Sequence, residues 1–191
     1  APQHVLSLTT QTSFGARPLR SPQMAAPFSL APGETADVYI RFWSEGSSIL
    51  PVSITSRETF LQTASATAAR NFVFYGLISA FIVAALVGSI VFGSFTAAVF
   101  AAYASFALLF VMHSDGTGFQ YLYPHLPGFN SAASVVWGGG FVFFSALYAK
   151  VFLRTSGEFP YVDAALIFVM AVAVVLGLSI FIIDPQIVKR S

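Results

Sequence analysis

The feature that most constrains this chain is an uncharged stretch, because no Asp, Glu, Lys or Arg lies between Arg70 and Asp115. About 20 residues at roughly 1.5 Å per residue already cross a hydrocarbon core of about 30 Å. The stretch is therefore long enough to cross a bilayer twice. Of all 191 residues, 56% are hydrophobic and 9% are charged, whereas soluble domains have about 25% charged residues. These observations predict an integral membrane protein.

Four segments are apolar and long enough to form transmembrane helices. We predict these helices over residues 72–92, 95–112, 134–153 and 164–183, followed by a tail at 184–191. Only Gly93 and Ser94 separate the first two helices. Because so short a connection forces neighbouring helices to run antiparallel, the four helices should form a bundle over residues 72–183. Residues 113–133, rich in aromatic residues, Gly and Pro, are predicted to be a loop.

The first 59 residues have a different pattern, in which apolar residues recur at every second position. The alternating positions are Val38, Ile40 and Phe42, then Leu50, Val52 and Ile54, with shorter runs at 28–30 and 5–10. A period of two predicts strands with one buried face. Because about 60 residues without a disulfide make a marginal β core, we expect this domain to be truncated. The predicted fold class is thus a membrane protein with an all-β segment at 1–59, a connector at 60–71 and four transmembrane helices.

Two groups of small residues suggest how the helices pack. The first is a ladder spaced by four, which consists of Gly76, Ala80, Ala84 and Gly88. Lipid gives helices no hydrophobic reason to associate, so small residues matter because they let two backbones approach closely. The second group is the triplet Gly138, Gly139 and Gly140. The triplet either packs closely against the ladder or forms a hinge.

Four residues between 113 and 133 are candidates for contacting a ligand or the β domain. They are Asp115, Gln120, Tyr121 and His125. Asp115 also fits a turn, because Asp accepts hydrogen bonds from nearby backbone amides and Gly116 tolerates a positive φ. His113, Asp115 and His125 could together bind a divalent metal, but their spacing matches no known metal-binding pattern. We therefore expect neither a metal nor a cofactor.

Several stretches of the chain resemble one family of receptors. These stretches are residues 27–54, the helix opening at 74–76, the Asp-Gly-Thr-Gly-Phe-Gln-Tyr-Leu-Tyr-Pro segment at 115–124, and residues 149–154 with Pro160 and Asp163. In this order they resemble bacterial seven-transmembrane receptors with diverse intracellular signalling modules. The chain departs from that family in two respects. It has four predicted helices instead of seven, and it has Phe92 to Phe95 where the family has an Arg-Asp turn.

The resemblance implies a sensor. In such a receptor a jelly-roll-like β domain meets a small, carbohydrate-like ligand outside the cell, and the helices pass a signal to a cytoplasmic kinase or cyclase. We therefore expect a fragment of a multi-pass receptor of the inner membrane, which contacts the lipid bilayer and could form a homodimer. The net charge of +1 is small and unclustered, so no nucleic-acid partner is expected.

The charged residues by themselves indicate the orientation of the chain in the membrane only weakly. Lys150 and Arg154 flank the connection between the third and fourth helices and favour a cytoplasmic position for it, with the N-terminal domain outside. Arg57, Arg70 and the basic C-terminus lie on the opposite side and weigh against this orientation.

Two other functional classes compete with the receptor, namely a transporter or channel subunit for an apolar solute and a membrane scaffold. Transporters carry ionisable residues within their spans, and none of the predicted spans has one near its middle. This favours the receptor, and we expect the chain to have no enzymatic activity.

Overall fold

The computed structural model describes residues 12–19, 21–41 and 52–183, and its regular elements in this part are all helical. They are η1 (Phe14–Ala16), α1 (Arg57–Phe92), α2 (Phe95–Ser114), α3 (Thr117–Tyr121), α4 (Pro127–Leu153), α5 (Thr155–Glu158) and α6 (Pro160–Ile183). Helices α1, α2, α4 and α6 are each long and apolar enough to cross a membrane. The prediction of four spans is therefore confirmed, and the protein is a helical, multi-pass membrane protein.

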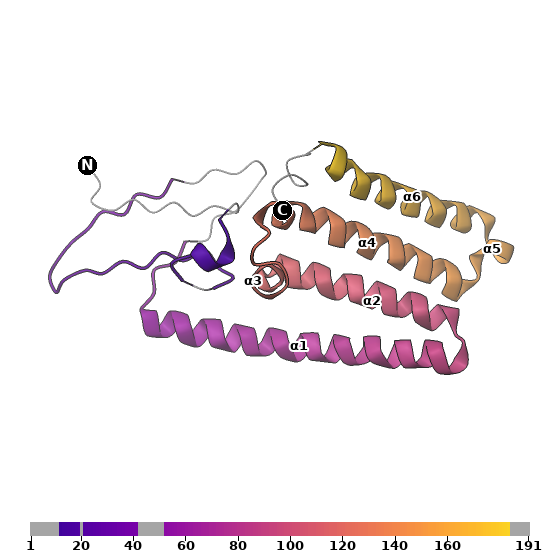
Figure 1. Cartoon of the computed structure of the whole chain (residues 1–191), viewed down its shortest axis with the longest axis horizontal. Coiled ribbons are helices and arrows are strands. Elements are labelled where there is room, and N and C mark those ends of the chain that lie inside the picture. The colour runs from indigo at the N-terminus through magenta and orange to yellow at the C-terminus, as the bar shows by residue number, and fades with distance from the viewer. Residues whose placement is uncertain (1–11, 20, 42–51, 184–191) are drawn as a thin grey trace.

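The four long helices lie side by side in the order α1, α2, α4, α6 (Figure 1). Helix α2 packs against both α1 and α4, and α4 packs against α6. The arrangement is a row, so α1 and α6 each pack against one other long helix and expose many apolar side chains, such as Ile90 and Phe168. A surface of this kind is suited to contact with lipid.

Three of the long helices begin earlier than predicted, each for a local reason. Helix α1 starts at Arg57 because Ser56 caps it, its Oγ accepting from the backbone N–H of Thr59 at 3.2 Å. Residues 57–75 contain neither Gly nor Pro, so the predicted connector at 60–71 is part of the same helix. Helices α4 and α6 begin at Pro127 and Pro160, where proline is well suited to a first helical turn.

The predicted strands are absent from the described residues, which corrects the β part of the expected fold class. Residues 28–30, 38–41 and 52–55 form no strand, and the side chains of Val38 and Ile40 are 57% and 59% exposed. A strand is stabilised by a paired neighbour and a buried face, and these segments have neither within the described residues. The predicted strand at 5–10 and residues 42–51 lie outside the described residues.

Helix α1 packs through a face marked by polar residues. Its buried and half-buried positions after residue 70 include Asn71, Tyr75, Ile78, Ile82, Ala85 and Ser89, a spacing of three and four. This spacing is that of a coiled-coil seam. The ladder lies largely on another face, where Gly76, Ala80 and Ala84 are exposed, and a Cβ added to Gly76 or Gly88 would meet nothing within 4 Å. Three of the four ladder residues therefore lie outside the contact with α2, and the fourth, Gly88, is half-buried.

The glycine triplet of α4 packs on α2 and α6, and not on the ladder of α1. A Cβ added to Gly140 would overlap the ring of Phe106, and one added to Gly138 would lie 3.2 Å from the ring of Phe110. On the other side, a Cβ on Gly139 would lie 3.5 Å from the carbonyl oxygen of Ala173 in α6. The triplet thus makes room for two aromatic rings of α2 and for the backbone of α6.

Candidate functional site

A network of polar groups centred on Asp115 joins α1 to the end of α2. The Asp115 carboxylate accepts hydrogen bonds from the Tyr75 hydroxyl and, at 3.3 Å, from the Asn71 amide. It also accepts from the backbone N–H of Thr117 at 3.0 Å. The Tyr75 hydroxyl lies 3.2 Å from the Thr117 hydroxyl. Four residues from two distant segments therefore provide one another with hydrogen-bond partners at the end of the membrane-spanning region.

Two glycines shape the turn beside this network. Gly116 has a φ of 79°, which a residue with a side chain rarely adopts, and a Cβ there would lie 3.1 Å from the Cβ of Pro22. A Cβ on Gly118 would lie 2.9 Å from the Tyr123 hydroxyl and 3.1 Å from the carbonyl oxygen of Met112. The turn thus needs glycine at both positions, and Gly116 is where the N-terminal segment approaches the helices.

An aromatic cluster anchors this N-terminal segment. Phe14 is 5% exposed, its ring meets that of Phe119 edge-on at 5.9 Å, and its backbone N–H donates to the carbonyl of Pro124 at 3.1 Å. Tyr123 continues the cluster, and its hydroxyl lies 2.9 Å from Nδ1 of His113. Burial raises the pKa of Tyr123 above its ordinary value of 10.0, so the phenol stays neutral.

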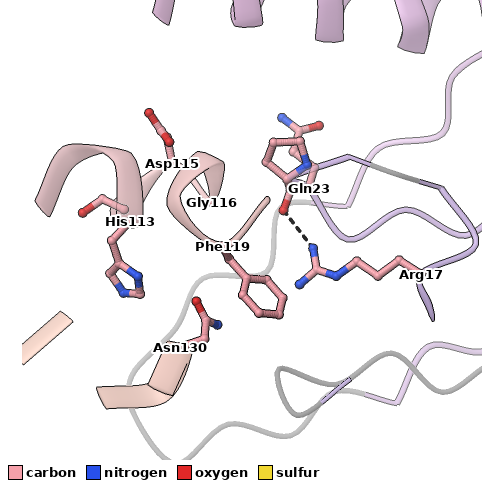
Figure 2. A pocket seen from close by; sticks show the side chains of 9 residues that line it. Arg17, Gln23, His113, Asp115, Gly116, Phe119 and Asn130 are labelled. Atoms are coloured by element: carbon pink, nitrogen blue, oxygen red, sulfur yellow. Dashed lines mark hydrogen bonds between the residues drawn. The ribbon is translucent and has the colours of Figure 1, made fainter. Parts of the chain in front are cut away.

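An open cavity of about 320 Å³ lies between the N-terminal segment and the ends of α2, α3 and α4. Arg17, Gln23, His113, Phe119 and Asn130 are among its lining residues, as Figure 2 shows. The guanidinium of Arg17 lies over two rings, 5.1 Å from the centroid of Phe14 and 5.3 Å from that of Phe119. Burial lowers the pKa of Arg17 from its ordinary value of 12.5. The cavity therefore combines one cation, the carboxylate of Asp115, amide groups and an aromatic face.

A second polar network lies at the opposite end of the row of helices. Asp163, at the start of α6, forms an ion pair with Lys150 and accepts from the Thr155 hydroxyl at 2.7 Å. The Ser156 hydroxyl donates to the same carboxylate oxygen at 3.2 Å. This network joins α4, α5 and α6, and it lies beside the αL residue Arg154, whose φ is 52°. Each of these polar groups has an ion-pair or hydrogen-bond partner within the network, as is typical of a structural junction between helices.

The comparisons with known proteins identify the helical region. The sequence profile described as 7TM diverse intracellular signalling matches residues 68–189, which include most of α1 and all of α2 to α6. The chain belongs to this signalling family. No curated protein and no solved structure matches the chain significantly. The family match confirms the resemblance that the sequence motifs indicated for the helices, and it does not extend to residues 1–67.

Within the family region, only one of the four predicted contact residues lines the cavity. That residue is Asp115, whose carboxylate is used by the network with α1. Gln120 is half-buried on α3, and His125 is exposed. Tyr121 is exposed and its ring meets that of Phe72 on α1 at 5.8 Å. Among the described residues no group of three His, Asp or Glu could hold a metal ion.

Several residues of the site were not anticipated from the sequence. They are Arg17, Asn71, Tyr75, Thr117 and Asn130. A signal for two of them does exist, because Asn71 and Tyr75 are polar residues four apart on one face of an apolar helix. Since unpaired polar groups are costly in lipid, this face had to find partners in the protein. Arg17 gives no such signal, because it lies in a segment whose pattern suggested a β domain.

Proposed function

We propose that this family member is the membrane part of a receptor that detects a small extracytoplasmic ligand and passes a conformational signal to a cytoplasmic kinase or cyclase. This proposal assigns no catalytic step to the described residues. The observation that carries it is the contact of Phe14 with Phe119, because it joins the segment before the family region to the helices. A ligand that moves this segment would therefore act directly on α3.

A continuous series of ring contacts supports transmission from this point into the helices. The series runs from Phe14 through Phe119, Tyr123, Phe129, Trp137 and Phe106 to Phe144, with centroids between 5.0 and 6.2 Å apart. Packed groups with two discrete arrangements can carry coupling between distant sites. The coupling along this series can be measured directly.

The coupling test removes the first ring of the series. In the intact receptor, Phe14→Ala should lower the ligand-dependent output at least threefold and increase amide hydrogen exchange in α3. Met24→Ala is the matched control, because Met24 is an exposed apolar residue of the same segment. Output that is as strong in Phe14→Ala as in the control would contradict the proposal.

The orientation can be tested cleanly because the chain contains no cysteine. His125 and Ser156 are both exposed and lie at opposite ends of α4. On intact cells, a membrane-impermeant maleimide should label His125→Cys and leave Ser156→Cys unlabelled until the cells are opened. The reverse labelling pattern would place residues 12–41 in the cytoplasm and exclude an extracytoplasmic sensor.

The output module can be tested from the gene. We expect the coding sequence beyond Ser191 to encode further helices followed by a kinase or cyclase domain. A stop codon directly after Ser191 would contradict an output on the same chain.

A further inference from the structure

The cavity beside Arg17 is large enough for a small molecule and is built from three parts of the chain. Its volume of about 320 Å³ lies at the lower end of the range typical for ligand sites, about 300 to 1,000 Å³. Its walls come from Arg17, Pro22 and Gln23, from the turn at 113–116 with Phe119, and from Asn130 on α4. A molecule in this cavity would therefore contact the N-terminal segment and the helices at once.

The two charged groups on the cavity wall, Arg17 and Asp115, have different partners. Nη1 of Arg17 donates to the carbonyl oxygens of Ser21 and Pro22, both at 3.3 Å, which fixes the guanidinium in place. No carboxylate of the described residues lies within 4 Å of this guanidinium, and its Nε and Nη2 have no acceptor there. A guanidinium stays protonated in proteins, so Arg17 places a positive charge with unused donors beside the cavity.

The one carboxylate on the cavity wall, Asp115, is held by α1. Asp115 is directed away from Arg17 in Figure 2, toward α1, where Tyr75 and Asn71 donate to it. The amides of Gln23 and Asn130 also line the cavity, and the ring of Phe119 provides a flat apolar surface between Arg17 and Asn130 (Figure 2). The arrangement favours a molecule with an acidic group, further polar groups and a flat or ring-shaped body.

We propose that this cavity binds a small organic anion, whose acidic group pairs with Arg17 and whose polar groups meet the amides of Gln23 and Asn130. The planar guanidinium can form two parallel hydrogen bonds with a carboxylate, which is a strong and directional pairing. Such a ligand would join Arg17 and Gln23 to α3 and α4 and hold the aromatic cluster together. This inference rests on the proposed receptor function and specifies where and what the receptor binds.

The test uses the full chain in phosphatidylcholine nanodiscs, with glucuronate as the probe and glucose as its uncharged match. We expect calorimetry to show saturable glucuronate binding and at least tenfold weaker glucose binding. Arg17→Gln should weaken glucuronate binding at least tenfold. Arg57→Gln is the matched control, because it removes an arginine outside the cavity, and it should leave binding unchanged.

A second variant covers the case in which Arg17→Gln disturbs the fold of its segment. The Asn130 side chain has no hydrogen bond within the described residues, so Asn130→Ala should leave the fold intact and weaken glucuronate binding several-fold. The proposal is overturned if glucuronate does not bind saturably, if glucose binds equally well, or if both variants bind like the unmodified chain.

Nanodiscs that contain phosphatidylglycerol distinguish a soluble anion from a lipid headgroup. For a soluble ligand, glucuronate affinity should be the same in both kinds of nanodisc. If phosphatidylglycerol weakens glucuronate binding by the unmodified chain and does not weaken it in Asn130→Ala, the cavity binds a lipid headgroup. This result would overturn the proposal of a soluble ligand. Failure of any of these binding tests leaves the Phe14 coupling result untouched, so the two proposals can fail independently.

Discussion

The small residues of α1 and those of α4 have the same chemistry but different surroundings. On α4, Gly138 and Gly140 receive the rings of Phe110 and Phe106 from the neighbouring helix. On α1, Gly76 faces open space in the described structure. The difference teaches that a glycine in an apolar helix marks a packing site only when the facing helix brings a side chain or backbone atoms against it. For the exposed ladder residues Gly76, Ala80 and Ala84, the packing role stays a prediction that concerns a partner outside the described residues.

The largest effect should come from filling the space at Gly140. Gly140→Ala places a Cβ within the ring of Phe106, which is itself stacked on Phe144 with centroids 5.0 Å apart. Because overpacking of this kind costs about 1 to 3 kcal/mol, we expect a loss of about 2 kcal/mol in the free energy of unfolding. Denaturant unfolding of the purified protein in detergent micelles would measure this loss.

A second substitution shows whether the ring is the cause. Combining Gly140→Ala with Phe106→Ala removes the overlap, so the pair should be no less stable than Phe106→Ala alone. Such non-additivity is expected for residues in contact. Additive losses would show that Gly140 is needed for another reason, such as a hinge in α4.

Gly138→Ala should have a smaller effect of the same sign. The added Cβ would lie 3.2 Å from the ring of Phe110, so the ring must shift by a few tenths of an ångström. Phe110 is stacked on Phe141 at an interplanar angle of 5°, which resists this movement. We expect a loss below about 1 kcal/mol, since alanine also favours the helix by roughly that amount. A loss equal to that of Gly140→Ala would break the proposed ranking.

Gly76→Ala should have the smallest effect. Nothing lies within 4 Å of the added Cβ, so no contact opposes the preference of helices for alanine. We expect stability to stay equal or to rise by less than about 1 kcal/mol. A clear loss of stability in the same unfolding assay would indicate that α1 packs through its ladder after all, for example in a dimer.

Sequence reasoning named Asp115 as a candidate contact residue, which stays a prediction, and it missed the partners of Asp115 for a physical reason. Asp115 was identified because an acidic residue followed by Gly116 at the end of an apolar segment is informative on its own. Its partners Asn71 and Tyr75 are 44 and 40 residues away, and hydrogen bonds over that separation depend on how two helices are rotated. The cavity depends in addition on Arg17, whose segment has no local signal for docking on α3.

The sequence by itself determined the number of spans, their approximate positions and the receptor family. Hydropathy is a sum over neighbouring residues, so the four helices follow from local composition, and short connections make them antiparallel. Only the tertiary structure decided which face of each helix packs and which segments meet at the site. In lipid all apolar faces are nearly equivalent, so the rotation of each helix is fixed by the few polar groups and large rings that must find partners.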